Sequence, residues 1–184
     1  MTGNQVVLVD QNDNEIGVME KLEAHQKGLL HRAISIFIFN KNNQLLLQRR
    51  AFDKYHSGGL WTNTCCSHPY PNEMVLDAAN RRLEEEMGLN TPLFKAFSFI
   101  YKSSLDNNLT EYELDHIFIG FSDQTPHLNL EEASSFKWLT LEEIKQEISL
   151  FPEHYTSWFK ILMDEHIEKF FELVQNESLQ KSEF

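Results

Sequence analysis

The alternation of hydrophobic and polar residues predicts strands in the first third of the chain. Apolar runs at residues 6–9 and 33–39 are each followed by polar residues that are typical of turns. Residues 40–43 would form the loop of a hairpin whose second strand covers residues 44–49. This part of the protein is therefore expected to build a sheet.

Helical spacing is clearest in the middle of the chain, at residues 73–87. Apolar residues recur there every three or four positions, on one side of a helix: Leu76, Ala79, Leu83 and Met87. Gly88 follows, where a glycine can end a helix in the left-handed conformation. We therefore expect an amphipathic helix that ends at this glycine.

Strands and helices alternate through the rest of the chain. Strands are predicted at residues 94–101, 112–121 and 136–139. A short helix capped by Thr140 and a long helix after Pro152 follow. No repeat or linker divides the sequence, so we expect one domain over residues 1–184 with a polar, frayed C-terminal tail from about residue 176. The mixed order of elements predicts an α/β or α+β sandwich.

Composition and charge exclude several classes of partner. Hydrophobic residues make up 41% of the 184, enough for a core. A formal charge of −12 with scattered basic residues argues against binding to nucleic acid, and no run of eighteen apolar residues indicates a membrane span. The two cysteines, Cys65 and Cys66, are adjacent and cannot close an ordinary disulfide. We expect a soluble, cytoplasmic protein with no membrane partner.

A thiol and an imidazole lie close together in residues 61–69, which read WTNTCCSHP. If this segment is extended, Thr64, Cys66 and His68 share one face and Cys65 lies on the other. Cys66 beside His68 would suit proton transfer or metal binding, whereas Cys65 is expected to pack as a small hydrophobe. Simple core packing of both cysteines is the alternative.

Three carboxylates alternate in residues 111–116, which read EYELDH. In a strand, Glu111, Glu113 and Asp115 would share one face, opposite Tyr112 and Leu114. A bound cation would relieve their mutual repulsion, and solvent would screen it on an exposed face. The pattern leaves both interpretations open.

Two further histidines, His25 and His31, are separated by a loop-like stretch that would let them converge before the strand at residues 33–39. With His68, Glu111 and Glu113 they would form a set of three nitrogens and two carboxylates. Such a set suits Mn²⁺ or Zn²⁺. Taken singly, each histidine is more often a surface residue.

Acidic residues also cluster near the end of the predicted helix, at Glu84, Glu85 and Glu86. Arg81 and Arg82 stand four residues before the last two of them, so surface salt bridges explain part of the pattern. The helix dipole disfavours negative charge at this end, and a bound divalent ion would offset it. Salt bridges and a metal therefore remain alternatives.

The same region is similar to the Nudix box, G-x5-E-x7-R-E-U-x-E-E-x-G-U, in which U is aliphatic. The chain has Ser67 and Glu73 at the first two fixed positions, and residues 81–89 read RRLEEEMGL. Ser67 replaces the opening glycine, and Arg82 replaces the first glutamate of the Arg-Glu pair. Nudix hydrolases use that glutamate to gather metals, so its loss argues against hydrolysis.

Joined to residues 62–69 and 110–113, this altered box closely resembles type I isopentenyl-diphosphate delta-isomerases. Other motifs occur in that family's order between about residues 21 and 158, namely His25, residues 28–33, Arg50 with Lys54, and Trp158. The resemblance implies a Nudix-type α/β/α sandwich with a mixed sheet. It also implies an enzyme of isoprenoid biosynthesis that interconverts isopentenyl and dimethylallyl diphosphate by proton transfer through a carbocation-like intermediate.

The resemblance also implies roles for individual residues. The residues that handle protons or cover the hydrocarbon would be Cys66, Glu113, Tyr101 and Trp158. The residues that bind the small-molecule diphosphate would be Lys21, Arg50, Lys54 and Ser67. The ligands of one metal, Mn²⁺ or Zn²⁺, would be His25, His31, His68, Glu111 and Glu113. Glu86 would bind a Mg²⁺ that also touches the diphosphate, while Asp115 and His116 receive no role.

Two other functions remain open. A Nudix pyrophosphohydrolase would use the acidic helix to activate water, but Arg82 argues against it and it has no use for Cys66. A noncatalytic metal-binding domain would leave Cys66, Trp158 and the basic residues without a role. The product distinguishes the three functions, because it would be an isomer, inorganic phosphate or neither.

Overall fold

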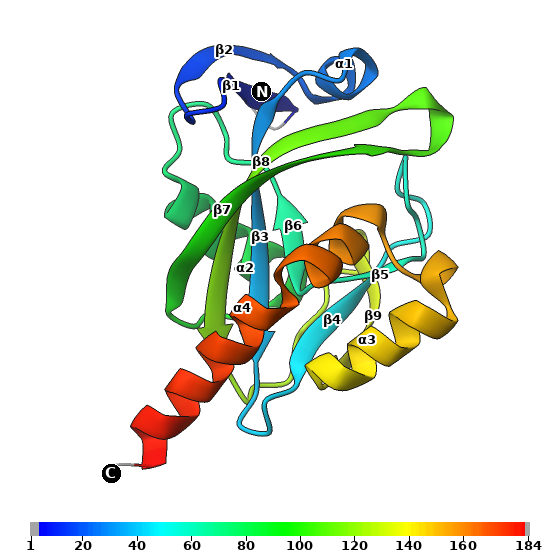
Figure 1. The fold of residues 1–184 in the computed structure, drawn as a ribbon. Helices are drawn as coiled ribbons and strands as arrows, with labels where there is room; N and C mark the ends of the chain where they lie inside the picture. The colour runs from blue at the N-terminus through cyan, green and yellow to red at the C-terminus, as the bar shows by residue number, and fades with distance from the viewer. Residues whose placement is uncertain (1–3, 183–184) are drawn as a thin grey trace.

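The computed structural model describes the backbone of residues 4–182 and the side chains of residues 4–176. Figure 1 shows its elements arranged around a twisted sheet. In chain order they are β1 (Gln5–Val9), β2 (Glu15–Glu20), α1 (Lys21–Lys27), β3 (His31–Phe39), β4 (Leu45–Arg50), β5 (Trp61–Thr62), β6 (Cys65–Ser67), α2 (Val75–Met87), β7 (Leu93–Ser104), the 3₁₀ turn η1 (Asp106–Asn108), β8 (Thr110–Phe121), β9 (Ala133–Leu139), α3 (Leu141–Leu150), the 3₁₀ turn η2 (Pro152–His154) and α4 (Ser157–Ser182).

Strand β3 lies at the centre of the sheet (Figure 1). It pairs antiparallel with β6 along one edge and parallel with β8 along the other, where His31 lies opposite Glu113. Strands β7 and β8 form a long antiparallel hairpin that places Tyr101 opposite Glu113 from the other side. Strand β4 continues the sheet to β5 and β9. The sheet is thus mixed, and its centre carries residues of the predicted site.

Helices cover both faces of the sheet. Alternate residues of β3 point to opposite sides and are apolar on both, so each face needs a covering helix. Ile34, Ile36 and Ile38 pack in a core with α2. Phe37 and Phe39 pack in a second core with α3 and α4. Figure 1 shows α2 behind the sheet and α4 in front of it. The predicted α/β/α sandwich with a mixed sheet is confirmed.

Most predicted elements are present, with ends shifted by a few residues. The helix predicted at residues 73–87 begins only at Val75, because the Glu73 side chain instead accepts hydrogen bonds from the Tyr70 amide and the Arg81 guanidinium. It ends at Gly88, whose positive φ of 61° and backbone bond to Glu84 make a left-handed cap. The sequence analysis missed β2 and α1, in which charged residues and Gly17 interrupt the apolar pattern.

The C-terminal helix α4 extends into the polar tail. The backbone of residues 176–182 is helical in the described part of the chain, and the predicted fraying of the tail stays a prediction. These residues include good helix formers such as glutamine, glutamate, leucine and lysine, and no glycine or proline interrupts them. Across the described residues, none of the helices combines the length and apolar character that a membrane span requires.

Candidate active site

Helix α1 places two site residues one turn apart. The Glu20 carboxylate accepts a hydrogen bond from the Glu23 amide and begins the helix, and Gly28 ends it at a positive φ of 59°. Lys21 and His25 therefore lie on the same side of this short helix. His25 is fully buried, and its ring centroid is 4.8 Å from that of His31 at the start of β3.

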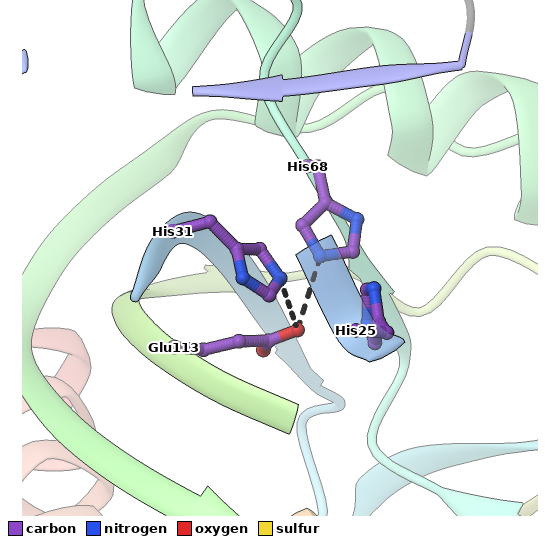
Figure 2. Close-up of side chains that lie close together, drawn as sticks. All are labelled: His25, His31, His68 and Glu113. Atoms are coloured by element: carbon purple, nitrogen blue, oxygen red, sulfur yellow. Dashed lines mark hydrogen bonds and ion pairs between the residues drawn. The ribbon is translucent and has the colours of Figure 1, made fainter. Parts of the chain in front are cut away.

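His31 and His68 converge on the carboxylate of Glu113, with His25 beside them (Figure 2). His68 Nε2 lies 3.0 Å from Glu113 Oε1, and His31 Nε2 lies 3.4 Å from the same oxygen. The parallel pairing of β3 and β8 fixes the second contact, while β6 delivers His68 from the opposite edge of β3. Three separate parts of the sequence thus meet at one carboxylate.

The tautomers of two of these histidines fit metal binding. Nδ1 of His25 lies 2.7 Å from the Lys21 carbonyl, and Nδ1 of His31 lies 2.8 Å from the Leu29 carbonyl. A carbonyl only accepts, so each Nδ1 carries the hydrogen and each Nε2 keeps its lone pair. Both Nε2 atoms are buried without a hydrogen-bond partner among the described residues. Unpartnered lone pairs facing a carboxylate are what a divalent cation would satisfy.

The ligand atoms are also close enough to share one ion. Those of His25, His31, His68 and Glu113 all lie within 4.8 Å of one another. Glu111 belongs to an adjoining group of the same dimensions, with His25 and His56. All five predicted ligands of the histidine site are therefore brought together.

Glu86 lies elsewhere, on α2. It is 3% exposed, and its carboxylate pairs with Arg82 Nη2 at 2.5 Å and accepts a hydrogen bond from Gln48 Nε2 at 2.9 Å. The i,i+4 salt bridge expected from the sequence is present. Glu86 is not part of either potential metal group found among the described residues, so its role as a Mg²⁺ ligand stays a prediction.

Burial favours the neutral form of two histidines of the cluster, His25 and His68. It lowers the pKa of His68 to about 3, and Lys21 adds to the effect; it also lowers the pKa of His25. Neutral imidazole is the form that binds metals. Burial and the neighbouring Glu113 carboxylate raise the pKa of Glu111 well above its usual value. The cluster therefore disfavours two free negative charges side by side.

Cys66 lines a small pocket next to this cluster. Its Sγ accepts a hydrogen bond from Trp158 Nε1 at 3.2 Å. Burial raises the pKa of the thiol to about 12, and the nearby Asp115 adds to this, so the thiol is neutral. Across the pocket, Tyr101 Oη donates to Glu113 Oε2 at 2.6 Å. All four predicted proton-handling and hydrocarbon-covering residues therefore line one pocket.

The four predicted diphosphate-binding residues line an adjoining recess of about 230 Å³: Lys21, Arg50, Lys54 and Ser67. Arg81 and Arg82 add two more cations to its wall. Lys54 is paired with Glu132 at 2.5 Å, but Arg50 Nε is buried without a hydrogen-bond partner among the described residues. This recess suits an anion and opens onto Cys66 and His68, which line both spaces.

The site's composition agrees with the comparisons to known proteins. The NUDIX domain family matches residues 29–159. An isopentenyl-diphosphate Delta-isomerase of Pectobacterium atrosepticum is 55% identical over 157 residues, which cover 85% of this chain and 88% of the relative. The chain belongs to the isopentenyl-diphosphate Delta-isomerase family of NUDIX proteins. Isopentenyl-diphosphate Delta-isomerase 2 of Aromatoleum aromaticum is 53% identical over 161 residues, which cover 88% of this chain and 85% of the relative.

Solved structures support the fold of this isomerase family member. The crystal structure of DR0079 from Deinococcus radiodurans matches with a TM-score of 0.67 at 20% identity, covering 79% of this chain and 89% of that one. At this identity the likeness concerns the fold alone. The family match thus assigns the NUDIX domain to residues 29–159, and the solved structure shares the fold of this chain.

Several residues of this isomerase-family site were not predicted. His56, Asn63 and Ser35 contact or line the pocket, and no spacing in the sequence pointed to them. Asp115 did continue the alternation of carboxylates, and it accepts a hydrogen bond from Ser35 at 2.7 Å. Burial, followed by the charge of Glu113, raises the Asp115 pKa to about 8.

The sequence analysis made two predictions about which side chains share a face in residues 61–69; one is confirmed and the other is wrong. Cys65 and Cys66 do lie on opposite sides, with Cys65 in the core against α2. Thr64 was expected on the face of Cys66 and His68, which is wrong. Its hydroxyl instead donates to the Leu46 carbonyl, because the chain bends before β6 begins.

Proposed function

We propose that this protein interconverts isopentenyl diphosphate and dimethylallyl diphosphate, the reaction named in its relatives, for isoprenoid biosynthesis. The observation that carries the proposal is one pocket that holds a thiol, Cys66, and a carboxylate, Glu113, beside a cationic recess. Moving a double bond by one carbon requires a proton added at one end and another removed at the other. A diphosphate in the recess would place the hydrocarbon between these two groups.

The sheet sets the spacing of the two groups. Cys66 is on β6 and Glu113 is on β8, and β3 lies between these strands. Neighbouring strands are about 4.8 Å apart, so β6 and β8 are separated by about 10 Å across the sheet. Cys66 lies opposite Ser35 of β3 and Glu113 lies opposite His31, so the two residues are also offset by about 13 Å along β3. Their side chains project from the same face of the sheet and line the same pocket. This arrangement favours proton transfer on opposite faces of the substrate.

Cys66 and Glu113 each act in both directions, because the reaction is reversible: the group that donates in one direction accepts in the other. Trp158 donates to the sulfur and Tyr101 to the carboxylate, and these bonds would hold both groups in place. The indole also lines the pocket and would stabilise positive charge on the hydrocarbon by about 1–2 kcal/mol. Both aromatic side chains are buried, which limits the access of water to a cationic intermediate.

The substrate's diphosphate is remote from the reacting carbons, so its binding can contribute to orientation. Lys21, Arg50, Lys54 and Ser67 would bind it, and Glu86 would hold an accompanying Mg²⁺. The three histidines with Glu111 and Glu113 would hold Mn²⁺ or Zn²⁺. A cation bound there would neutralise the paired carboxylates and fix their orientation. The cytoplasmic location and the lack of nucleic-acid or membrane partners stay predictions from the sequence.

Product analysis in heavy water tests this function. Purified protein with isopentenyl diphosphate, Mg²⁺ and Mn²⁺ should form dimethylallyl diphosphate that carries deuterium in its new methyl group. Removal of metals by a chelator should stop the reaction, and added metal should restore it. Release of inorganic phosphate from a nucleoside diphosphate derivative, without any isomer, would instead identify a hydrolase.

A further inference from the structure

The side chain of Asn63 is buried beside the Cys66 thiol, and the reaction described above does not use it. Its two amide hydrogens are donated to the backbone carbonyls of Ile36 at 3.2 Å and Cys65 at 2.9 Å. An amide oxygen could not make these contacts, so they establish which end of the side chain is nitrogen. Oδ1 must then face Cys66 Sγ, which lies 2.8 Å away.

A chain of buried hydroxyls supports Asn63 Oδ1 from its other side. Thr62 Oγ1 donates to Oδ1 at 2.9 Å, and Thr156 Oγ1 donates to Thr62 at 3.1 Å. Thr156 is also bound through its amide to the Trp61 carbonyl, just before α4 begins. The side chains of Thr62, Asn63 and Thr156 are all almost fully buried. Every hydrogen-bonding group of the Asn63 amide therefore has a partner.

The Cys66 sulfur has one hydrogen and three polar oxygens near it. Ser35 Oγ and Thr62 Oγ1 are distant from the sulfur, at 3.7 and 3.8 Å. Each hydroxyl donates its own hydrogen elsewhere, Ser35 to Asp115 and Thr62 to Asn63. Asn63 Oδ1 is nearly 1 Å closer and has no hydrogen to offer, so it is the acceptor for S–H. Trp158 Nε1 donates to the same sulfur. The sulfur is thus held between one acceptor and one donor.

We propose that Asn63 is a positioning residue for Cys66: its side-chain carbonyl accepts the S–H hydrogen and fixes the sulfur at the wall of the pocket. The role rests on the proposed function, since orientation matters only if protons pass through this thiol. Without Asn63 the S–H group would turn toward Ser35, Thr62 or the pocket. The sulfur would then meet the substrate carbon in a productive arrangement less often.

The S–H stretching band in the infrared spectrum tests the hydrogen bond directly. It lies apart from other protein bands and moves to lower frequency when the thiol donates. The Cys66 band is the one that Cys66→Ala removes, and in the wild-type protein it should lie below that of an alkanethiol in hydrocarbon solvent. Asn63→Ala should move it to higher frequency. It should also lower kcat by about ten- to a hundred-fold while leaving KM for isopentenyl diphosphate unchanged.

Thr64→Val is the matched control. Thr64 is buried in the same segment and bonds to the backbone of Leu46 and Ile38, away from Cys66. This variant should lose stability but keep both the band and kcat. A wild-type Cys66 band at the free-thiol frequency overturns the proposal, and this measurement does not depend on whether Asn63→Ala folds. A loss of kcat in Thr64→Val equal to that in Asn63→Ala also overturns it. If no isomer forms at all, the proposed function fails while the band still reports on the hydrogen bond.

Discussion

Replacing Tyr101 by phenylalanine should slow turnover by about ten- to a hundred-fold. The change removes a single oxygen, which donates to Glu113 at 2.6 Å and lies 3.3 Å from Glu111. The ring can stay stacked on Phe99, whose centroid is 5.5 Å away, so no cavity forms. A hydrogen bond to a charged group contributes about 1.5–3 kcal/mol, and about 1.4 kcal/mol corresponds to a tenfold change in rate. The loss should appear in kcat, since Tyr101 is not among the groups proposed to bind the diphosphate.

The same variant should change the pH dependence of kcat. A hydrogen bond to a carboxylate favours the ionised form, so its removal raises the pKa of Glu113. Glu113 accepts a proton only when it is ionised. The acidic limb of the kcat profile should therefore move to higher pH, and a shift to lower pH would contradict the assigned contact.

Tyr155→Phe provides a control of the same chemistry at another place. Tyr155 is also buried and also donates to a carboxylate, that of Glu147, which lies outside the pocket. Steady-state assays of isomer formation should find its kcat unchanged, although its unfolding free energy falls. Equal losses of kcat in the Tyr101 and Tyr155 variants, or a change in KM alone for Tyr101→Phe, would refute the reasoning.

Three further substitutions, with a control for the third, test separate parts of the site. Cys66→Ala should abolish turnover while circular dichroism and metal content stay normal, because the thiol is not an expected metal ligand; near-normal activity would remove it from the mechanism. His68→Ala should deplete the metal measured by elemental analysis, and full occupancy would break the proposed ligand set. Arg82→Ala should lower the free energy of unfolding by about 3–5 kcal/mol in chemical denaturation, because it leaves Glu86 buried without its cation. Arg81→Ala should cost less, since its carboxylate partners are more exposed, and equal costs would contradict this account.

Strand alternation predicted the parts of the site that depend on one strand at a time. Glu111, Glu113 and Asp115 share a face, as do Cys66 and His68, because a strand turns each second side chain to the same side. The meeting of these strands with α1 depends on contacts between distant segments. The residue types suggested it as a hypothesis, and the resemblance to a family supported it. Asn63 was missed because its contacts involve carbonyls of neighbouring strands and, through Thr62, the Thr156 hydroxyl just before α4.

Loop residues were the hardest to predict. His56 follows Lys54 in a segment without regular structure, and no periodic pattern marks it. Its ring centroid lies 6.1 Å from that of His25 and 5.9 Å from that of Trp158, because the folded loop brings it to the pocket. Burial, with Arg50 adding to it, lowers the pKa of His56 to about 3. Such placement follows from the folded chain and not from local sequence.

Arg82 explains how the fold of a hydrolase family can accommodate a different reaction. It stands where the Nudix box has a glutamate, and it pairs with Glu85, Glu86 and Glu132 at 2.8, 2.5 and 3.3 Å. Arg82 therefore offsets part of the negative charge that would otherwise attract further metal ions beside the diphosphate recess, in addition to the Mg²⁺ proposed for Glu86. A hydrolase needs those ions there to activate water against phosphorus. Among the described residues, the Nε2 atoms of His25 and His31 in the cluster around Glu113 have no hydrogen-bond partner, next to the pocket where carbon would be protonated. We expect the change at this helix position to favour diphosphate binding over diphosphate cleavage.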